Sequence, residues 1–245
     1  ILILIVLKRC NVFGLGYIGL PTSVVVCSGG YVVNGVDIDK KIVDVINKGK
    51  VHIVEVELEE QVEKYIKSGM LNASTKPKKA EVHLIAVPTP LKLTKGKEPQ
   101  PDISHVLAVA RSIANIIEKG NLVIIESTCP VGTTEEVLNL ISNESKLEPE
   151  DFYVAYCPER VIPGNIMSEI INLDRIVGGF NSQSSLIAKK FYESFSKGKI
   201  ITTNSKTAEL TKLTENAFRD VNIAFANEIS ILCEEQEIDP IELIE

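Results

Sequence analysis

The stretch Gly14-Leu15-Gly16-Tyr17-Ile18-Gly19 decides the fold, because it places G-x-G-x-x-G between a strand and a helix. Apolar Val12 and Phe13 precede it, and a helix-like segment, 20–27, follows. The first two glycines allow a tight turn and close approach of a pyrophosphate group, and the third lets the helix pack on the strand. The helix N-terminus also favours an anion. The motif predicts a dinucleotide site, although such glycines also occur in strand-to-helix turns that bind nothing.

An acidic residue follows at the expected distance. The next predicted strand ends at Asp37, 18 residues beyond Gly19. In dinucleotide-binding units, an acidic side chain at this distance accepts hydrogen bonds from the adenosine ribose hydroxyls. Its charge would repel a 2′-phosphate. We therefore expect the cofactor to be NAD and not NADP.

The pattern around this motif predicts the fold class. From Leu2 to about Ser205, short runs rich in Val and Ile alternate with longer helical patterns. Such alternation predicts βαβ units, and hence an α/β fold with a Rossmann-like doubly wound parallel sheet. A helix is expected over 102–118 and a surface loop over the proline-rich segment 88–101. The predicted strands are 3–13, 31–37, 82–87, 121–127, 152–156, 174–178 and 199–203.

The character of the sequence changes after residue 204. Residues 207–236 contain neither proline nor glycine and predict one long helix. Its second half is apolar on several sides, so either another chain segment or a partner subunit must cover it. Asp239 and Pro240 then mark another helix start, and we expect the chain to stop inside that element. The sequence thus divides into a unit over 1–204 and the beginning of a helical unit over 205–245.

Composition argues against several classes of partner. The formal net charge of −7 over 245 residues supplies none of the phosphate neutralisation that nucleic-acid binding needs. The apolar run Ile1–Leu7 is far shorter than the roughly 20 residues of a membrane span. It also has neither the basic residues before it nor the small residues at a cleavage site after it that a signal peptide needs. We expect a cytoplasmic protein that binds neither nucleic acid nor membrane. No metal site is expected, because the five cysteines are scattered without a C-x-x-C pair and read as buried thiols.

Three later loops follow predicted strands and carry polar residues. Thr89 follows 82–87, Thr128 follows 121–127, and the pair Glu159-Arg160 follows 152–156. Ligands of doubly wound folds bind at the carboxyl ends of the strands, so these loops should share one edge with the glycine loop. The threonines are candidate cofactor contacts, and the charged pair could face an anionic or hydroxyl-bearing substrate. The alternative is that these residues only shape the loops.

The long helix carries a further candidate group. Lys212 and Asn216 are four residues apart and share one helix face, and Arg219 follows three residues later. A lysine and an asparagine directed at one point can stabilise an oxyanion, and a lysine of lowered pKa can also move a proton. A solvated helix face is the alternative explanation of this trio.

Together these residues fall into segments by which the chain closely resembles the nucleotide-sugar 6-dehydrogenases, and within them the branch that acts on UDP-N-acetyl-D-mannosamine. The matching segments are GLGYIGLPT (14–22), GVDID (35–39), HIVE (52–55), LIAVPTP (84–90), ESTCPVGTTE (126–135), AYCPERVIPG (155–164), DRIVGG (174–179) and KTAELTKLTENAFRDVNIAFANE (206–228). The resemblance implies an NAD-binding N-terminal domain, a central all-α dimerisation domain beginning at the long helix, and a C-terminal UDP-binding domain absent from this chain. A homodimer through 207–236 is the implied assembly.

The implied reaction oxidises the C6 hydroxyl of a UDP-sugar to a carboxylate with two NAD. One hydride leaves the alcohol, and a cysteine thiol then captures the aldehyde. A second hydride leaves the resulting thiohemiacetal to give a thioester, which water hydrolyses. Covalent capture divides the difficult step, because an aldehyde yields a second hydride readily only after a nucleophile has made it tetrahedral.

The resemblance also assigns roles residue by residue. Lys212 corresponds to an acid/base and oxyanion-stabilising lysine, and Asn216 to the asparagine beside it. Glu159 is a candidate to orient water or share proton transfer, and Thr128 joins these catalytic candidates. The NAD contacts implied are Gly14, Gly16, Tyr17, Ile18, Gly19, Asp37, Thr89 and Thr128. The substrate contacts implied are Arg160, Val161, Lys212, Asn216 and Arg219.

The sequence also departs from relatives of this family. Pro163 occupies a place where UDP-glucose dehydrogenases have a second glutamate, and this difference favours an acetamido sugar. Ile42 stands where many relatives have a basic residue, whose role the neighbouring Lys41 could take. The implied nucleophile lies in a glycine-rich segment that this chain lacks, and the flanks of Cys129 and Cys157 belong to other motifs. Alternative functions are oxidation of UDP-GlcNAc or UDP-glucose, a β-hydroxyacid dehydrogenase, and a non-catalytic dinucleotide-binding dimer module.

Overall fold

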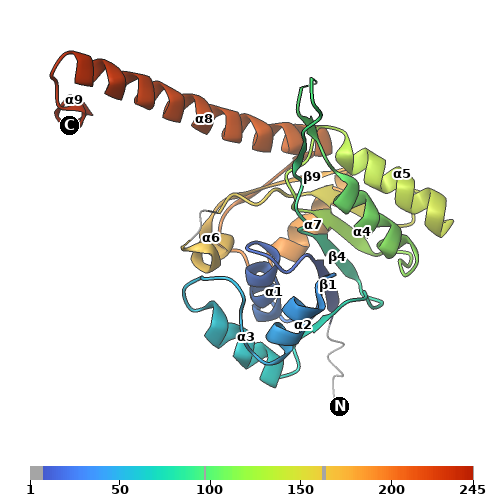
Figure 1. The fold of residues 1–245 in the computed structure, drawn as a ribbon. Coiled ribbons are helices and arrows are strands. Elements are labelled where there is room, and N and C mark those ends of the chain that lie inside the picture. The colour runs from blue at the N-terminus through green and yellow to red at the C-terminus, as the bar shows by residue number, and fades with distance from the viewer. Residues whose placement is uncertain (1–7, 97, 162–163, 245) are drawn as a thin grey trace.

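The structure is a computed structural model that describes residues 8–96, 98–161 and 164–244. Its centre is an eight-stranded sheet with the order β10-β9-β8-β7-β4-β1-β2-β3 (Figure 1). The strands of this sheet are β1 (Arg9–Phe13), β2 (Val32–Val36), β3 (Leu71–Ser74), β4 (Val82–Ile85), β7 (Leu122–Ile125), β8 (Tyr153–Tyr156), β9 (Arg175–Gly179) and β10 (Ile200–Asn204). The first residues of the strand predicted over 3–13 lie outside the described residues.

Six strands form the expected doubly wound arrangement. In the sheet these six strands lie in the order β3-β2-β1-β4-β7-β8. Numbered one to six along the chain, they have the order three-two-one-four-five-six of a Rossmann unit. Their pairing is parallel, and β1 aligns Val12 with both Gly35 and Leu84. The central strands β1, β4 and β7 are almost entirely buried because helices cover both faces. Their carboxyl ends therefore meet at one edge of the sheet.

The predicted parallel sheet is confirmed over most of its width, and the pairing differs only at its far side. Strand β9 runs antiparallel to β8 through two residue pairs, and β10 runs parallel to β9. The alternation of strands and helices cannot show this, because the direction of a strand depends on which edge the intervening chain returns to. The edge strand β3 was also missed, since exposed Asn72 interrupts its short apolar pattern.

Helices cover both faces of the sheet (Figure 1). They are α1 (Gly19–Ser28), α2 (Lys40–Asn47), α3 (Leu58–Lys67), α4 (Ser104–Ala114), α5 (Thr133–Ser145), α6 (Ile166–Asn172), α7 (Ser182–Tyr192), α8 (Ser205–Glu235) and α9 (Pro240–Ile244). One buried cluster joins the sheet to α1, α2, α3, α6 and α7, and the other joins it to α4, α5 and the start of α8. Both faces of the central strands are therefore excluded from water.

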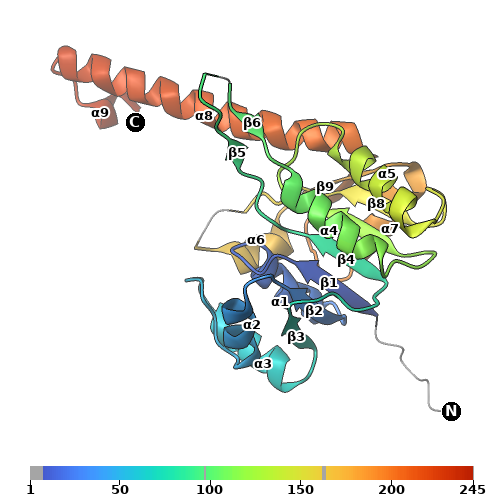
Figure 2. The ribbon, with the colours of Figure 1, turned by 45° about the vertical axis from the view of Figure 1, so that its right-hand side comes forward.

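Two segments differ from their predicted extents. Helix α4 ends before residue 118, because the Asn115 side chain donates to the Arg111 carbonyl (2.9 Å) at its C-terminus. Within the proline-rich segment, β5 (Leu91–Lys92) and β6 (Gln100–Pro101) pair as an antiparallel hairpin where a loop was expected. Figure 2 shows this hairpin projecting from the body beside α8.

The long helix is confirmed, and it extends beyond the body of the fold (Figures 1 and 2). The Asn204 side chain begins α8 by accepting a hydrogen bond from the Thr207 backbone N–H at 2.9 Å. At the other end, Asp239 accepts from the Ile241 N–H at 2.8 Å, which confirms the predicted helix start at Pro240. Within the described ranges, no helix combines the length and apolar character needed to cross a membrane.

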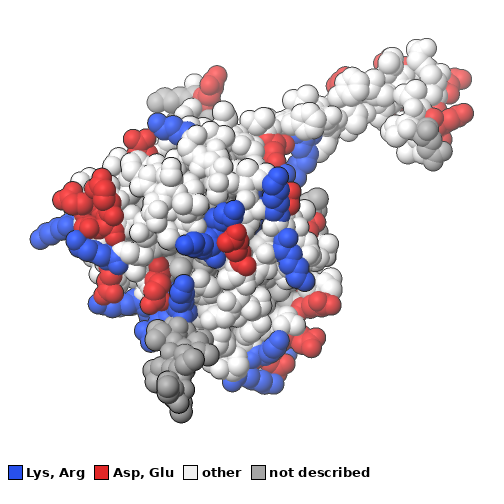
Figure 3. Space-filling view, turned by 180° about the vertical axis from the view of Figure 1, so that it is seen from behind, with Lys and Arg blue, Asp and Glu red and all other residues white. Residues whose placement is uncertain are grey.

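The surface of the body mixes the two signs of charge. On the face opposite that of Figure 1, Figure 3 shows blue and red side chains interspersed over the body, whereas the projecting helix is largely uncharged until its tip. Helix α8 also exposes several large apolar side chains, among them Val221, Ile223 and Phe225.

Candidate active site

A cavity of about 790 Å³ opens at the carboxyl edge of the sheet. Its walls come from the loops after β1, β2, β3, β4, β7 and β8, together with α2, α4 and α8. The predicted site residues that line it are Gly14, Gly16, Tyr17, Ile18, Asp37, Thr89, Thr128, Glu159, Val161 and Lys212. Tertiary structure thus joins segments that are almost 200 residues apart in sequence into one site.

The glycine loop is shaped by close backbone contacts. Gly14 has a φ of 85°, and an added Cβ would lie 2.7 Å from the Ala86 carbonyl oxygen. A Cβ on Gly19 would lie 1.7 Å from the Gly14 carbonyl oxygen, so only glycine lets α1 start this close to the loop. At Gly16 a Cβ would meet no described atom within 4 Å. Because Gly16 lines the cavity, this open space suits a pyrophosphate approaching the backbone.

Asp37 is held in place at the end of β2. One carboxylate oxygen accepts from the Leu15 N–H and the other from the Asp39 N–H, both at 2.9 Å. Each oxygen keeps a lone pair, so the carboxylate can still accept from ribose hydroxyls. Ile42 also lines the cavity, whereas Lys41 is not among its lining residues. The local wall beside Asp37 is therefore apolar rather than basic.

The two threonines join neighbouring loops. The Thr89 hydroxyl donates to the Thr128 carbonyl oxygen at 2.7 Å, which ties the loop after β4 to the loop after β7. Ser127 strengthens the same junction, because its hydroxyl donates to the Val87 carbonyl at 2.7 Å. Both threonines are half-buried in the cavity wall. The threonines therefore shape the loops, and they also line the cavity.

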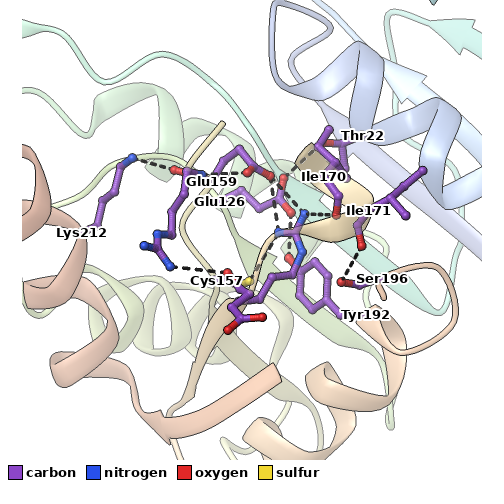
Figure 4. A network of polar contacts seen from close by, with 12 residues as sticks. Thr22, Glu126, Cys157, Glu159, Ile170, Ile171, Tyr192, Ser196 and Lys212 are labelled. Carbon is purple, nitrogen blue, oxygen red and sulfur yellow. Dashed lines mark hydrogen bonds and ion pairs between the residues drawn. The ribbon is translucent and has the colours of Figure 1, made fainter. Parts of the chain in front are cut away.

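Lys212 reaches the cavity from α8. Its ammonium donates a 2.6 Å hydrogen bond to the Glu159 backbone carbonyl (Figure 4). One turn earlier, buried Glu209 accepts from the backbone N–H groups of Gly132 and Thr134 at 2.7 and 2.8 Å, which fixes the helix against α5. Burial lowers the pKa of Lys212, although the charges of Glu215 and Glu159 oppose the shift. The lysine is therefore both positioned and shifted toward its neutral form.

The Glu159 carboxylate turns away from the lysine into a buried ion pair. Its Oε2 accepts from Arg175, whose Nη2 lies 3.3 Å away, and its Oε1 accepts from the Arg160 N–H at 2.7 Å. The Arg175 guanidinium also lies over the Tyr192 ring, 4.8 Å from its centroid. Both partners of this ion pair are at least nine-tenths buried. Its geometry fixes the loop that carries Glu159.

A second buried carboxyl, Glu126, adjoins this pair. It accepts from the Tyr192 hydroxyl at 2.7 Å and from the Thr22 hydroxyl at 3.5 Å (Figure 4). Sequence reasoning did not select Glu126, Arg175 or Tyr192. A signal was present, since Glu126 directly follows a four-residue apolar strand, where a charge at the ligand-binding edge invites a functional explanation.

The remaining substrate candidates are not brought into the cavity. Arg160 is exposed and forms a 2.6 Å ion pair with Glu215 of α8. The Arg219 guanidinium contacts the Asn216 side-chain oxygen at 3.5 Å, and neither residue lines the cavity. The helix trio therefore separates into Lys212 inside the cavity and two residues beside it. Pro163 lies outside the described residues.

The cysteines behave as buried thiols. All five are free and buried, which confirms that expectation. Burial raises the pKa of Cys129 and of Cys157 to about 12. A thiolate is the reactive form, so neither thiol near the cavity is suited to act as a nucleophile at neutral pH. Among the residues with described positions, no group of three or more His, Cys, Asp or Glu is arranged to hold a metal ion.

Comparison with known proteins identifies the family of this chain. Residues 8–196 match the NAD binding domain of the UDP-glucose/GDP-mannose dehydrogenase family, and residues 206–245 match its central domain. NAD is the cofactor of the matched N-terminal domain.

Individual relatives are similar over nearly the whole chain. UDP-N-acetyl-D-mannosamine dehydrogenase of Campylobacter jejuni is 48% identical over 97% of this chain and 59% of its own length. NDP-N-acetyl-D-galactosaminuronic acid dehydrogenase of Ralstonia nicotianae is 46% identical over 97% of this chain and 57% of its own length. A structure of UDP-D-ManNAc dehydrogenase from Pyrococcus horikoshii superposes with a TM-score of 0.91 at 43% identity, covering 96% of this chain and 56% of the other.

The chain thus spans somewhat more than half the length of these relatives. The family match covers the glycine loop, the cavity loops and the lysine-bearing helix, which are the parts that form the site. This chain belongs to the UDP-glucose/GDP-mannose dehydrogenase family.

Proposed function

We propose that these residues form the NAD-binding and proton-transfer part of an enzyme that oxidises the C6 hydroxyl of UDP-N-acetyl-D-mannosamine to a carboxylate with two NAD. One observation carries the proposal: Lys212 lines the same cavity as Gly16 and Asp37. A cofactor-binding edge and a positioned lysine therefore face one space, which is large enough for a small-molecule ligand.

The cofactor end of the cavity is assigned first. When bound, NAD supplies the hydride acceptor for each oxidation. The glycine loop, with Tyr17 and Ile18, binds the pyrophosphate region, and Asp37 binds the adenosine ribose. Thr89 and Thr128 contact the remainder of the cofactor from the opposite wall. Asp37 excludes NADP because a carboxylate and a 2′-phosphate repel each other.

Lys212 accepts the proton that the substrate hydroxyl loses in the first oxidation. Loss of a hydride from an alcohol carbon leaves a proton on oxygen, which a base must remove. Burial shifts Lys212 toward the neutral form that can accept it, and the ammonium then stabilises the oxyanion of later tetrahedral species. Asn216 supports the same oxyanion after the side chain adjusts toward the substrate. Thr128 holds the neighbouring loop in register.

The second oxidation requires a nucleophile. A thiol adds to the aldehyde, hydride loss converts the thiohemiacetal to a thioester, and water hydrolyses the thioester to the carboxylate. We assign the nucleophile to none of the five cysteines here, because burial raises the pKa values of the two nearest the cavity. Glu159 orients the hydrolytic water or shares its proton transfer.

The sugar nucleotide is placed between the lysine-bearing helix and the loop after β8. Arg160, Val161 and Arg219 are the proposed contacts, together with Lys212 and Asn216. Names of similar proteins include UDP-N-acetyl-D-mannosamine and NDP-N-acetyl-D-galactosaminuronic acid dehydrogenases, which supports an N-acetylated sugar. Arg160 is held by Glu215, so substrate binding would exchange this ion pair for a phosphate contact.

A homodimer through α8 completes the proposal. The surface of α8 carries large exposed apolar side chains, among them Phe218, which is 71% exposed, and Phe225, which is 66% exposed. A helix with such a surface gains stability when a second apolar surface removes it from water. We assign residues 1–204 to the cofactor-binding domain and 205–245 to the beginning of the dimerisation domain.

Ligand binding tests the proposal in two steps. Calorimetric titration of this chain should show binding of NAD in preference to NADP. In the complete enzyme, which would include the UDP-binding domain implied by the family resemblance, UDP-N-acetyl-D-mannosamine should bind beside NAD in preference to UDP-glucose. Binding of UDP-GlcNAc or UDP-glucose at equal strength would shift the substrate assignment to those sugars, and failure of every UDP-sugar to bind the complete enzyme beside NAD would instead favour a non-catalytic dinucleotide-binding module.

A further inference from the structure

The network that includes the labelled carboxyls of Glu126 and Glu159 (Figure 4) also contains the buried guanidinium of Arg175. Glu126 and Glu159 are 3% and 8% exposed, and Arg175 is the cation that forms a buried ion pair with one of them. That pair joins Arg175 to Glu159 at 3.3 Å. The Lys212 ammonium contacts a backbone carbonyl of the same loop instead of either carboxylate.

Glu126 is the carboxyl without its own cation. Its oxygens accept from the neutral hydroxyls of Tyr192 and Thr22, whereas Glu159 also accepts from a backbone N–H. Two carboxyls that share one cation in a buried site do not both ionise readily. Burial, and next the charge of Glu159, raise the pKa of Glu126 to about 7.

Every element packed around Glu126 contributes to this environment. The titratable or charged groups that face it are Arg175 of β9, Glu159 and Cys157 after β8, Tyr192 of α7 and Cys10 of β1. Burial raises the pKa values of both thiols and of the tyrosine, so these three stay neutral. The charges of Glu159 and Arg175 act on Glu126 in opposite directions, and that of Glu159 has the larger effect. A further positive charge entering the cavity would favour the ionised form of the Glu126 carboxyl.

Glu126 also lies at the reactive end of the cavity, whose wall it helps to form. Glu126 follows β7, which neighbours β8 and the loop that carries Glu159. Asp37 follows β2, and strands β4 and β1 lie between β7 and β2 in the sheet. If the adenosine ribose of a dinucleotide binds at Asp37, its nicotinamide would lie in the part of the same cavity that Glu126 and Lys212 line. That ring carries a positive charge in NAD⁺ and none in NADH.

We propose that Glu126 is a charge-compensating carboxyl of the cofactor cavity, which releases its proton when the cationic nicotinamide of NAD⁺ binds and takes a proton back when the ring is neutral NADH. The proton passes to and from solvent, and the ring charge disappears because the hydride brings two electrons. This inference rests on the proposed NAD-binding function and adds a proton linkage to it.

The test is calorimetry of NAD⁺ and NADH binding in two buffers of different ionisation enthalpy, from pH 6 to 8. Wild-type protein should release protons on binding NAD⁺, with affinity rising by up to about tenfold per pH unit below the midpoint. NADH should release none. Glu126→Gln should bind NAD⁺ without proton release, and the control Glu136→Gln, at an exposed carboxylate of α5, should behave as wild type.

Two results would overturn the inference: equal proton release with NAD⁺ and NADH, or full proton release in Glu126→Gln. If that variant does not fold, Tyr192→Phe serves in its place. It removes the hydroxyl that favours the ionised carboxylate, so the midpoint should move to higher pH, and an unmoved midpoint would also count against the idea. If wild-type protein binds neither nucleotide, it is the proposed function that fails.

Discussion

The side-chain ammonium of Lys212 lies 2.6 Å from the backbone carbonyl oxygen of Glu159 and donates a hydrogen bond to it. This contact joins α8 to the loop after β8, across 53 residues of sequence. The lysine therefore has a defined position at the cavity before any ligand binds. Such preorganisation reduces the rearrangement needed when charge develops on a substrate oxygen.

Replacing Lys212 should separate catalysis from cofactor binding. In the complete enzyme, Lys212→Ala should lower kcat by about 10²–10⁴-fold, because the base and oxyanion partner is lost. NAD affinity should change little, since the adenosine and pyrophosphate contacts lie elsewhere. Steady-state kinetics and NAD titration measure the two effects. Lys206→Ala, at an exposed lysine paired with Glu135, is the control; an unchanged kcat in Lys212→Ala would remove the assigned role.

Asp37 should determine the choice between NAD and NADP. Asp37→Ser removes the charge that repels a 2′-phosphate and one acceptor for the ribose hydroxyls, so the NAD/NADP affinity ratio should fall by about tenfold or more. Parallel titrations with both cofactors give the ratio. Asp44→Ser, at an exposed position on α2, should leave it unaltered. The ribose assignment is wrong if the two variants have the same ratio.

Alanine substitutions at two glycines of the same motif should impair the protein for different reasons. Gly16→Ala places a Cβ in open space, so thermal stability should be retained while NAD binding weakens sharply. Gly19→Ala places a Cβ 1.7 Å from the Gly14 carbonyl oxygen, so the loop or α1 must shift and the protein should lose stability by about 1–3 kcal/mol. Thermal unfolding with and without NAD distinguishes the effects. Equal loss of stability in both variants would contradict this division.

The buried carboxyl should make stability depend on pH. Because the pKa of Glu126 is raised from 4.5 to about 7 in the folded protein, the folded state binds its proton more tightly than the unfolded chain. Its contribution to the free energy of unfolding is fully present below pH 4.5 and is lost as pH rises through 7. The loss should reach at most ~3 kcal/mol.

Urea unfolding of wild-type protein and Glu126→Gln at pH 5.5 and 8.0 measures this contribution. Between these values, the stability of the wild type should fall relative to that of the glutamine variant. Glu136→Gln should follow the wild type. A wild type and a Glu126→Gln variant with parallel pH profiles would show that the carboxyl does not titrate in this range.

The exposed face of α8 should control assembly. Replacing Phe218 and Phe225 together by glutamate would place charges in an apolar interface and should convert a dimer to a monomer. Sedimentation velocity reports the change. Leu186→Glu on α7, where the side chain is 50% exposed, should leave a dimer intact. Wild-type protein that sediments as a monomer at high concentration would exclude a dimer formed by this chain alone.

Much of the fold follows from local sequence. The Rossmann unit, the strand-to-helix turn and the long helix were all predicted. Each depends on residues that are close in sequence: the apolar strands, the glycine motif and the proline-free segment. Strand β3 and the antiparallel β9 were not, because exposed Asn72 breaks a short pattern and strand direction depends on distant pairing. Local propensity carries no information on that choice.

The sequence by itself determined the cofactor class and the family motifs, since these depend on residue types at fixed spacing. Only the tertiary structure decided which candidates share one cavity, and it brought Lys212 in while leaving Asn216 and Arg219 outside. It also placed Glu126 beside the Arg175–Glu159 pair, from three separate strand ends. Charges interact through space and burial, which spacing along a chain does not encode.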